Sequence, residues 1–600
     1  MADLTRVTTA DTLTADAIGG EHLGNKYYRS FRFIGTILGT SLALCAAYAA
    51  YLLPVGIISY INEDIGPDPD NVWIPVVWAI CVALGYMLFG RLSDIFGRRY
   101  FVVIGNLFGL IGAIVAATAS NIRTLIGASV FIGIAASVQL SYTMIVGELV
   151  PIKHRGYWYF LTLIPVIPFA FFGAYLSHNF LQVATWRWCY YLCIILQGLA
   201  LVLLVVSYHP PSFRKLHSTK SRTAMIKEID YIGVFIWMVG VVLFLLGINW
   251  GGSKYPWDSA AVISTLVLGI VGIVSFFVWE ANGTAKKPLL PWAFLIKNPR
   301  GFLLPMVSGT IGGMFYYGLT IIWPTQVNTV YASSLQVDGW LASILACGTQ
   351  TGTMLGSLVF KRLGHHRLQL IGAYVFMIAF CAGLSQAGVH QRSVAVSCAF
   401  LTGLGCGVVE NLVVLVAQVG KDAAEIGLVV GTIGSFRSLG GALAQAIYVT
   451  ILTNKLKGEL ASKVPAAALK AGLPASSLPA LFQAIAAESA AAFAAVPGIS
   501  TTIVAAVELA EVEAYSASFQ YVYYACIAFG GVGLITSLFI TKNVDAEMTD
   551  FVAKKLEGVA VKHHDHEHDL EGKPGTGTAA HEETVMVQSI VEEPKGRIAQ

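Results

Sequence analysis

Long apolar runs, separated by short polar segments, follow one another along almost the whole chain. A membrane-spanning helix needs about 20 mostly apolar residues, because its backbone groups must be satisfied internally while it crosses the hydrocarbon core. The runs lack the two-residue period that is typical of a half-buried strand. The pattern therefore predicts an all-α integral membrane protein with fourteen transmembrane helices, at 36–58, 72–92, 101–120, 124–147, 157–178, 188–207, 230–249, 259–280, 302–323, 337–360, 368–387, 393–418, 426–453 and 520–541.

The composition supports a chain that crosses a lipid bilayer many times. Hydrophobic residues make up 56% of the 600 residues, and charged residues make up only 12%, about half of the usual share. No basic run is interleaved with aromatic residues, so no nucleic-acid partner is expected. The membrane runs contain no Cys, His, Asp and Glu cluster with metal-ligand spacing, and the chain has no phosphate-binding lysine loop. We therefore expect neither an enzyme nor a metal or cofactor site.

The distribution of Lys and Arg predicts the orientation in the membrane. Positive residues in short loops favour the cytoplasmic side. The loops that follow every second predicted helix carry these residues, for example Arg91, Arg98 and Lys153. The remaining loops form the opposite side, and the first of them, 62–71, carries only acidic charges. We therefore expect a multi-pass protein with both termini in the cytoplasm.

The polar segments divide the chain into five parts. These are a cytoplasmic N-terminal tail, a six-helix half, two inserted helices with cytoplasmic loops, a second six-helix half and a cytoplasmic C-terminal tail, at 1–35, 36–207, 208–301, 302–541 and 542–600. The second half includes an outside loop, 454–519, in which we expect short amphipathic helices lying against the outer surface. The C-terminal tail is expected to be disordered. Its histidine-rich stretch, 563–569, is typical of either metal binding or a solvated tail, and we expect the latter.

The most specific motif follows the second predicted helix. Gly90 and Gly97 allow a close helix approach and a tight turn. Asp94 can pair with the positive ends of neighbouring helices or with arginines. Such contacts would hold the inner side closed and would have to break for it to open. The alternative is that Arg98 and Arg99 only anchor the loop on the inner side.

A degenerate copy of this motif, 357–366, follows the tenth predicted helix. The two copies align on Gly97 and Gly364, which predicts two related halves, the arrangement of secondary transporters. Lys361 occupies the position of Asp94 in the second copy. The contacts that the two copies form at the inner side therefore cannot be equivalent.

Gly90-x3-Asp94-x2-Gly97-Arg98-Arg99 resembles the inner-loop signature of the major facilitator superfamily. Further stretches resemble the fungal trichothecene efflux pump family, and these are 61–66, 147–151, 186–191, 435–441, 471–474 and 496–499. The resemblance covers nearly everything except the tails.

This resemblance implies a major facilitator fold with 14 transmembrane helices arranged 6 + 2 + 6. It also implies a drug:proton antiporter of the fungal plasma membrane that exports toxins, secondary metabolites or drugs. Its partners would be a small amphipathic organic substrate, protons and the lipid bilayer, with no cofactor and no obligate protein partner. Related exporters often carry an arginine in the fourth helix where this chain has Ser129, so the proton route must use other residues.

Two charged residues, Glu410 and Arg437, lie well inside predicted helices. They are roughly 12 and 16 Å from the inner helix ends at 1.5 Å per residue, so they could meet. Charges within a membrane are costly and usually functional. One interpretation makes Glu410 the proton-exchanging carboxylate and Arg437 its switchable partner, and the alternative is a static ion pair. Glu148 is a weaker proton-coupling candidate, because it could also cap its loop or pair with Arg155.

Several aromatic and amide side chains are candidates for substrate contacts. They suit a bulky, mostly apolar ligand that forms hydrogen bonds, although tyrosines also pack between helices or lie at the membrane interface. The candidates are Tyr48, Tyr51, Gln139, Tyr142, Tyr316, Tyr317 and Asn411. Two other functions remain open, siderophore-iron uptake by a sister fourteen-helix branch and a membrane sensor that transports nothing. A sensor would be expected to carry a long signalling extension, and the tail of about sixty residues lacks the pattern of a folded domain.

Overall fold

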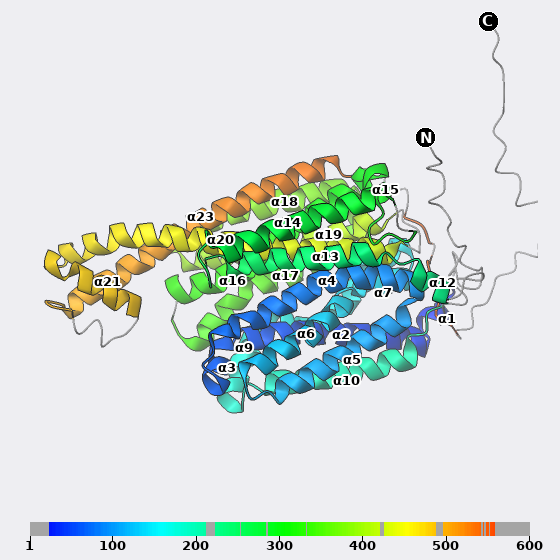
Figure 1. Ribbon diagram of the computed structural model, residues 1–600, viewed down its shortest axis with the longest axis horizontal. Helices are drawn as coiled ribbons and strands as arrows, with labels where there is room; N and C mark the ends of the chain where they lie inside the picture. The colour runs from blue at the N-terminus through cyan, green and yellow to red at the C-terminus, as the bar shows by residue number, and fades with distance from the viewer. Residues whose placement is uncertain are drawn as a thin grey trace, which may run out of the picture. The chain divides into compact units, whose positions relative to one another are not determined.

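The computed structural model describes residues 23–211, 222–252, 254–283, 286–331, 333–419, 425–487, 496–541, 544, 548–550 and 552–557. Long helices run side by side through these residues, in which β pairing is limited to isolated bridges (Figure 1). The prediction of an all-α membrane protein is confirmed. Thirteen helices in the described residues are long and apolar enough to cross a membrane. A further long helix, α17 (Leu335–Leu363), has lower hydropathy because 348–353 consists of Gly, Thr and Gln.

The first six predicted spans form one half of the bundle. Two of them are interrupted, the fourth at Leu140 and Ser141 and the fifth near Pro165 and Pro168, whose rings remove backbone donors. The helices are α2 (Phe31–Val55), α4 (Trp73–Phe96), α5 (Arg98–Ala117), α6 (Ile122–Gln139), α7 (Tyr142–Leu149), α8 (Arg155–Leu163), α9 (Ile167–Val183) and α10 (Trp188–Ser207). Short helices α1 (Asn25–Tyr28) and α3 (Ile58–Ile65) flank α2.

The second half contains the other six long helices. They are α16 (Leu304–Val330), α17, α18 (His366–Gln386), α19 (Arg392–Gln418), α20 (Ile426–Lys470) and α23 (Thr501–Phe539). Helix α4 packs against α20, and α17 packs against α8 and α9, so the two halves meet along two seams.

The inserted helices α13 (Tyr231–Trp250) and α14 (Ala260–Ala281) pack against each other beside the α4–α20 seam. The rings of Trp237 and Phe436 join α13 to α20, with centroids 5.5 Å apart. Helix α14 presents exposed apolar side chains suited to lipid, and these are Ile263, Val267, Leu268, Val271, Val274 and Val278. The predicted 6 + 2 + 6 arrangement is therefore confirmed. Helices α12 (Arg222–Lys227) and α15 (Trp292–Lys297) flank this pair in sequence.

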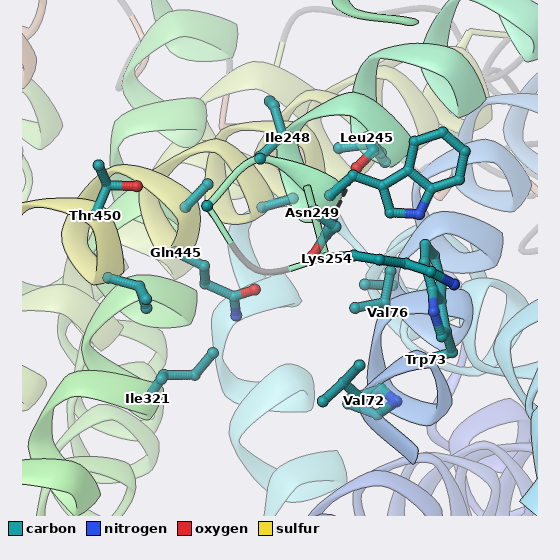
Figure 2. A pocket seen from close by; sticks show the side chains of 18 of the residues that line it. Val72, Trp73, Val76, Leu245, Ile248, Asn249, Lys254, Ile321, Gln445 and Thr450 are labelled. Carbon is teal, nitrogen blue, oxygen red and sulfur yellow. Dashed lines mark hydrogen bonds between the residues drawn. The ribbon is translucent and has the colours of Figure 1, made fainter. Parts of the chain in front are cut away.

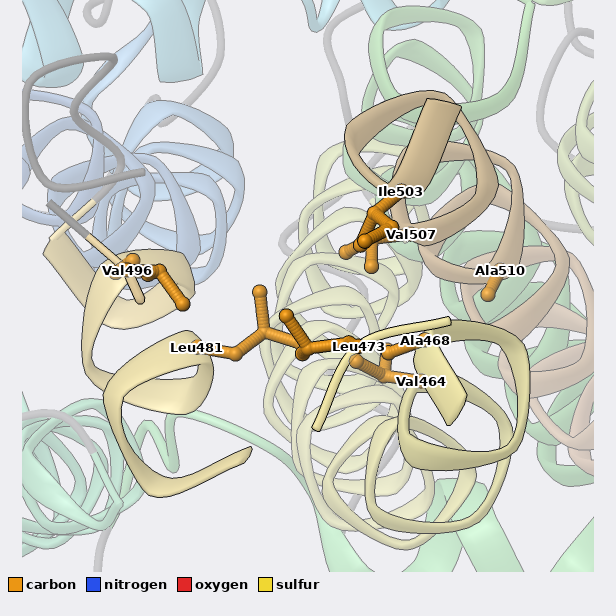
Figure 3. Packing of buried hydrophobic residues seen from close by; sticks show 9 residues of the cluster. Val464, Ala468, Leu473, Leu481, Val496, Ile503, Val507 and Ala510 are labelled. Atoms are coloured by element: carbon orange, nitrogen blue, oxygen red, sulfur yellow. The ribbon is translucent and has the colours of Figure 1, made fainter. Parts of the chain in front are cut away.

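The region between the last two spans differs from the prediction. Helices α20 and α23 continue past the bundle and form a projecting hairpin with α21 (Leu478–Ala487) (Figure 1). Apolar residues recur three or four positions apart on both long helices, so each presents a stripe that buries against the other. The buried cluster contains Val464, Ala468, Leu473, Leu481, Ala484, Val496, Ile503, Val507 and Ala510 (Figure 3). The expectation of short helices lying against the outer surface over 454–519 was wrong.

Part of the predicted C-terminal tail is also ordered. Residues 548–550 and 552–557, which we call the strap, contact the first half of the bundle, and Val552, Ala553 and Leu556 are buried. The expectation that disorder begins at 542 was wrong for the strap, because these small apolar side chains give it a surface to bury. The histidine-rich stretch 563–569 lies outside the described residues.

Candidate functional site

The candidate pathway has a closed end and a cavity, which lie toward opposite ends of α4. We call the end that carries Asp94 and Arg98 the basic end, and the end from which the α20–α23 hairpin projects the hairpin end. Seven of the residues in 73–82 of α4 line the cavity, and the charged contacts of Asp94 and Arg98 lie at the closed end. This arrangement is typical of a transporter that is open to one side at a time.

A buried charge network joins the two halves at the basic end. A guanidinium nitrogen of Arg98 lies 2.6 Å from Asp94 Oδ1 and 2.6 Å from Glu148 Oε1, and all three side chains are almost fully buried. The other oxygen of Asp94 accepts a hydrogen bond of 2.8 Å from the backbone N–H of Leu428, in the first turn of α20. Asp94 therefore pairs both with an arginine and with a positive helix end, and it joins the two halves.

Glycines make the close approach at this gate possible. A Cβ atom on Gly90 would overlap the carbonyl oxygen of Gly427 and lie 2.9 Å from Gly431 Cα, so α4 and α20 touch through their backbones. Gly97 has φ of 91°, a conformation that glycine adopts without strain, and it turns the chain from α4 into α5. Arg99 is set apart from the network, and it donates a hydrogen bond to the carbonyl of Val205 at the exposed surface.

Substitution of Gly90 by alanine is expected to prevent the basic end from closing and to abolish most transport. The added methyl group meets backbone atoms of α20, which cannot move aside as a flexible side chain could. Gly127→Ala is the matched control, because a Cβ on this α6 glycine has no described atom within 4 Å. Transport per molecule of protein in vesicles checks the prediction, and equal transport by the two variants would contradict it.

A second set of contacts joins the halves at the basic end. Arg155 donates a hydrogen bond of 3.3 Å to the carbonyl of Gln418, and the Tyr159 hydroxyl donates to the Gln418 side chain at 2.7 Å. These side chains link α8 to the end of α19. Glu148, for which the sequence allowed a pairing with Arg155, forms its described ion pairs with Arg98 and with Lys554 of the strap.

A cavity of about 1040 Å³ lies toward the hairpin end, between α2, α4, α13, α16 and α20. Figure 2 shows Trp73 and Val76 of α4 on the opposite side from Gln445 and Thr450 of α20. The rim of this cavity includes Asn454 of α20, whose side chain is exposed. The wall is rich in aromatic rings, with Tyr51, Trp73, Trp78, Trp250, Tyr255, Trp257 and Tyr317 among its residues. The inserted helix α13 therefore contributes directly to the cavity.

The two deep charges meet in the centre of the bundle. Arg437 Nε lies 3.0 Å from Glu410 Oε1, without the angle of a hydrogen bond. The guanidinium also lies 5.8 and 5.6 Å from the ring centres of Tyr316 and Tyr317. Tyr317 lines the large cavity, and Tyr316 and Glu410 line a small second cavity of about 10 Å³. Arg437 thus lies close to a ring of the large cavity, and Glu410 lines the small one.

Four of the seven predicted substrate residues line a cavity. Tyr51 and Tyr317 line the large one, and Tyr48 and Tyr316 line the small one. The remaining three, Gln139, Tyr142 and Asn411, line neither of these cavities.

Those three side chains make contacts between helices. Gln139 donates to Asn106 at 3.0 Å and to Gln197 at 2.7 Å, in a buried cluster of amides on α5, α6 and α10. Asn411 donates to Ser357 at 2.9 Å, and the Tyr142 ring lies edge-on to Tyr159. Buried polar groups need such partners, which explains why these residues face neighbouring helices.

Three features of the pathway were not predicted from the sequence. The tryptophan-rich wall comes partly from α13 and from the loop that follows it, which carries Trp257. Gln350 of α17 lines the small cavity beside Glu410, and its buried Nε2 has no hydrogen-bond partner in the described part of the chain. A glutamine in the middle of a predicted span was a usable signal, since polar groups there are rarely accidental. The third feature is Lys554, which lies in the predicted tail.

Comparisons with known proteins agree with this architecture. The family model of the fungal trichothecene efflux pump (TRI12) matches residues 5–592. Trichothecene efflux pump TRI12 of Trichoderma arundinaceum is 32% identical over 558 residues, covering 91% of this chain and 92% of the relative. The protein of the same name from Fusarium sporotrichioides is 29% identical over 545 residues, covering 90% and 91%. The solved structure of the major facilitator proton:xylose symporter XylE aligns with a TM-score of 0.51 at 14% identity, covering 88% of this chain and 99% of that one.

The helix arrangement and the likeness to a solved structure show the major facilitator fold. The family match defines the protein as a secondary transporter rather than an enzyme. The chain belongs to the fungal trichothecene efflux pump family. The predictions of fold, family and transport class are confirmed. The family match does not favour siderophore uptake or a non-transporting sensor. The roles assigned to individual site residues remain predictions.

Proposed function

We propose that this protein exports trichothecene-like or other small amphipathic molecules across the fungal plasma membrane in exchange for protons. In this proposal the basic end and both termini face the cytoplasm, because Lys and Arg gather in the loops at that end. The observation that carries the proposal is the Glu410–Arg437 ion pair beside an aromatic cavity, in a bundle whose basic end is closed.

The ion pair offers a way to couple proton movement to substrate movement. An ionised Glu410 is attracted to Arg437, and a protonated Glu410 is not. A proton that enters from the hairpin end would therefore release Arg437 and alter the cavity wall that contains Tyr317. Loss of the proton to the cytoplasm would restore the pair and prepare the site for the next substrate molecule. Each cycle would export substrate and import at least one proton.

The cavity supports a bulky and mostly apolar substrate. Aromatic rings from α2, α4, α13 and α16 provide large apolar contact surfaces. A few polar groups, including Asn249 and Gln445, could orient a ligand that carries hydroxyl, ester or epoxide oxygens. The relatives are named for trichothecenes, which makes this the first class to test here.

The proposal is tested with inside-out vesicles from yeast that expresses the full chain. A vesicle lumen made acidic by an imposed pH gradient is expected to accumulate a labelled trichothecene, and a protonophore is expected to abolish that accumulation. Empty-vector vesicles provide the background. Accumulation of the trichothecene that does not depend on the pH gradient would contradict proton coupling. Uptake of ferric siderophore into whole cells, without toxin export, would contradict the assigned substrate and direction.

A further inference from the structure

The strap forms hydrogen bonds with three segments at the basic end of the first half. Its backbone receives hydrogen bonds from the N–H of Lys153, which donates to the Thr549 carbonyl at 3.3 Å, and from the side chain of Arg32, which donates to the Glu557 carbonyl. The Glu557 N–H in turn donates to the His209 carbonyl at 2.8 Å. The strap thus contacts the N-terminal part of α2, the loop after α7 and the residues after α10.

Lys554 connects this strap to the buried gate. Its ammonium lies 2.9 Å from Glu148 Oε1, the same oxygen that Arg98 contacts, and its backbone N–H donates to the Glu148 carbonyl at 2.9 Å. The Lys554 residue is only 4% exposed. Burial lowers the pKa of the Lys554 ammonium, and the Glu148 carboxylate opposes this shift by favouring the charged form.

The charges of the network explain what the lysine contributes. Asp94 and Glu148 supply two carboxylates, and Arg98 supplies one positive charge for both of them. A buried carboxylate without full compensation is strongly unfavourable. Lys554 balances the network, and its backbone contact satisfies a carbonyl near the C-terminal end of α7, where helical carbonyls lack partners.

We propose that Lys554 is a positioning residue of the gate: it neutralises Glu148 and holds it against Arg98, and so stabilises the state in which the basic end is closed. The interaction chain runs from Lys554 through Glu148 and Arg98 to Asp94, which binds the first turn of α20. The strap therefore contributes to the transport cycle through its contact with Glu148. Without Lys554, hydration of Glu148 favours opening of the basic end.

Cysteine labelling of the α4–α20 seam tests this inference. The Ser435 hydroxyl is buried and donates to the Ala83 carbonyl at 2.6 Å, so a Ser435→Cys thiol is shielded when the basic end is closed. Lys554→Gln in this background is expected to increase labelling by a membrane-impermeant maleimide from the basic side by about fivefold or more. The nine native cysteines lie in membrane helices, and labelling of the chain without Ser435→Cys gives their background.

Two variants separate a role in the gate from a role in folding. Lys555→Gln is the matched control, because its half-buried lysine has no ion pair in the described residues and is expected to label at the parental rate. Lys554→Arg, which keeps the positive charge, is expected to restore slow labelling. Equal labelling of Lys554→Gln and Lys555→Gln, or no rescue by Lys554→Arg, would overturn the proposal.

A double variant tests whether Lys554 acts through Glu148. Glu148→Gln removes the charge that Lys554 balances, so Lys554→Gln is expected to add little further labelling in that background. An undiminished effect there would show that the lysine does not act through Glu148 and would overturn the inference. The inference rests on the alternating access of the proposed function. The labelling experiment needs no substrate. A failure of the Lys554 inference can therefore be distinguished from a wrong substrate or a wrong coupling ion in the proposed function.

Discussion

Glu410→Gln is expected to reduce proton-driven export to the background of empty vesicles. Glutamine keeps the size of the side chain but cannot bind and release a proton, so the coupling step is lost. The Glu410–Arg437 ion pair lies within a lipid-embedded bundle, where an ionisable side chain is costly unless it has a function or a partner. Uptake driven by a pH gradient, measured per molecule of protein, checks this result.

Glu508→Gln is the matched control for Glu410→Gln. Glu508 lies on the projecting hairpin and is exposed, so its substitution is expected to leave transport unchanged. Substrate exchange without a gradient is expected to persist in Glu410→Gln, because exchange needs substrate binding but no net proton movement. Normal gradient-driven uptake by a well-folded Glu410→Gln protein would contradict its role as the proton carrier and favour a static ion pair.

Arg98→Gln is expected to destabilise the folded protein by about 3–5 kcal/mol, the usual cost of removing one partner from a buried ion pair. The substitution removes the cation that contacts both Asp94 and Glu148, and Lys554 still pairs with Glu148. Transport is expected to be lost at the same time, since Asp94 no longer has the support that holds it against α20. A lower melting temperature in detergent, together with loss of uptake, checks both parts.

Arg99→Gln tests whether the position of the charge matters. Arg99 follows Arg98 directly, but its guanidinium contacts the Val205 carbonyl at the exposed surface, where a single interaction contributes about 1 kcal/mol or less. The melting temperature of the Arg99→Gln protein is therefore expected to stay close to that of the parent protein. Equal destabilisation by Arg98→Gln and Arg99→Gln would favour the alternative in which both arginines only anchor the loop.

The sequence predicted the bundle well because the length and apolarity of each run report directly on a membrane span. It did not predict the hairpin, because the stripe of Val464, Ala468, Ile503 and Val507 looks the same whether it packs on a partner helix or on a surface. The strap was missed for a related reason. A short segment of mixed polar and apolar residues carries no periodic signal, and the burial of Val552, Ala553 and Leu556 depends on the surface of the folded bundle.

The site residues were predictable where depth in the membrane defined them. Glu410 and Arg437 could be expected to meet from their depth alone, and they do. The direction of a side chain around its helix axis depends on tertiary packing, which explains why Gln139 and Asn411 face neighbouring helices. Glu148 was recognised as a candidate, but its partner Lys554 is 406 residues away in sequence.

We propose that this protein exchanges protons for substrate through Glu410. The most direct measurement uses purified protein in liposomes loaded with a pH-sensitive dye, to which a trichothecene is added on one side. We expect a substrate-dependent proton flux opposite to the substrate flux in the parent protein, and no such flux above background in Glu410→Gln. Substrate movement without proton flux, or an equal proton flux in the two proteins, would contradict it.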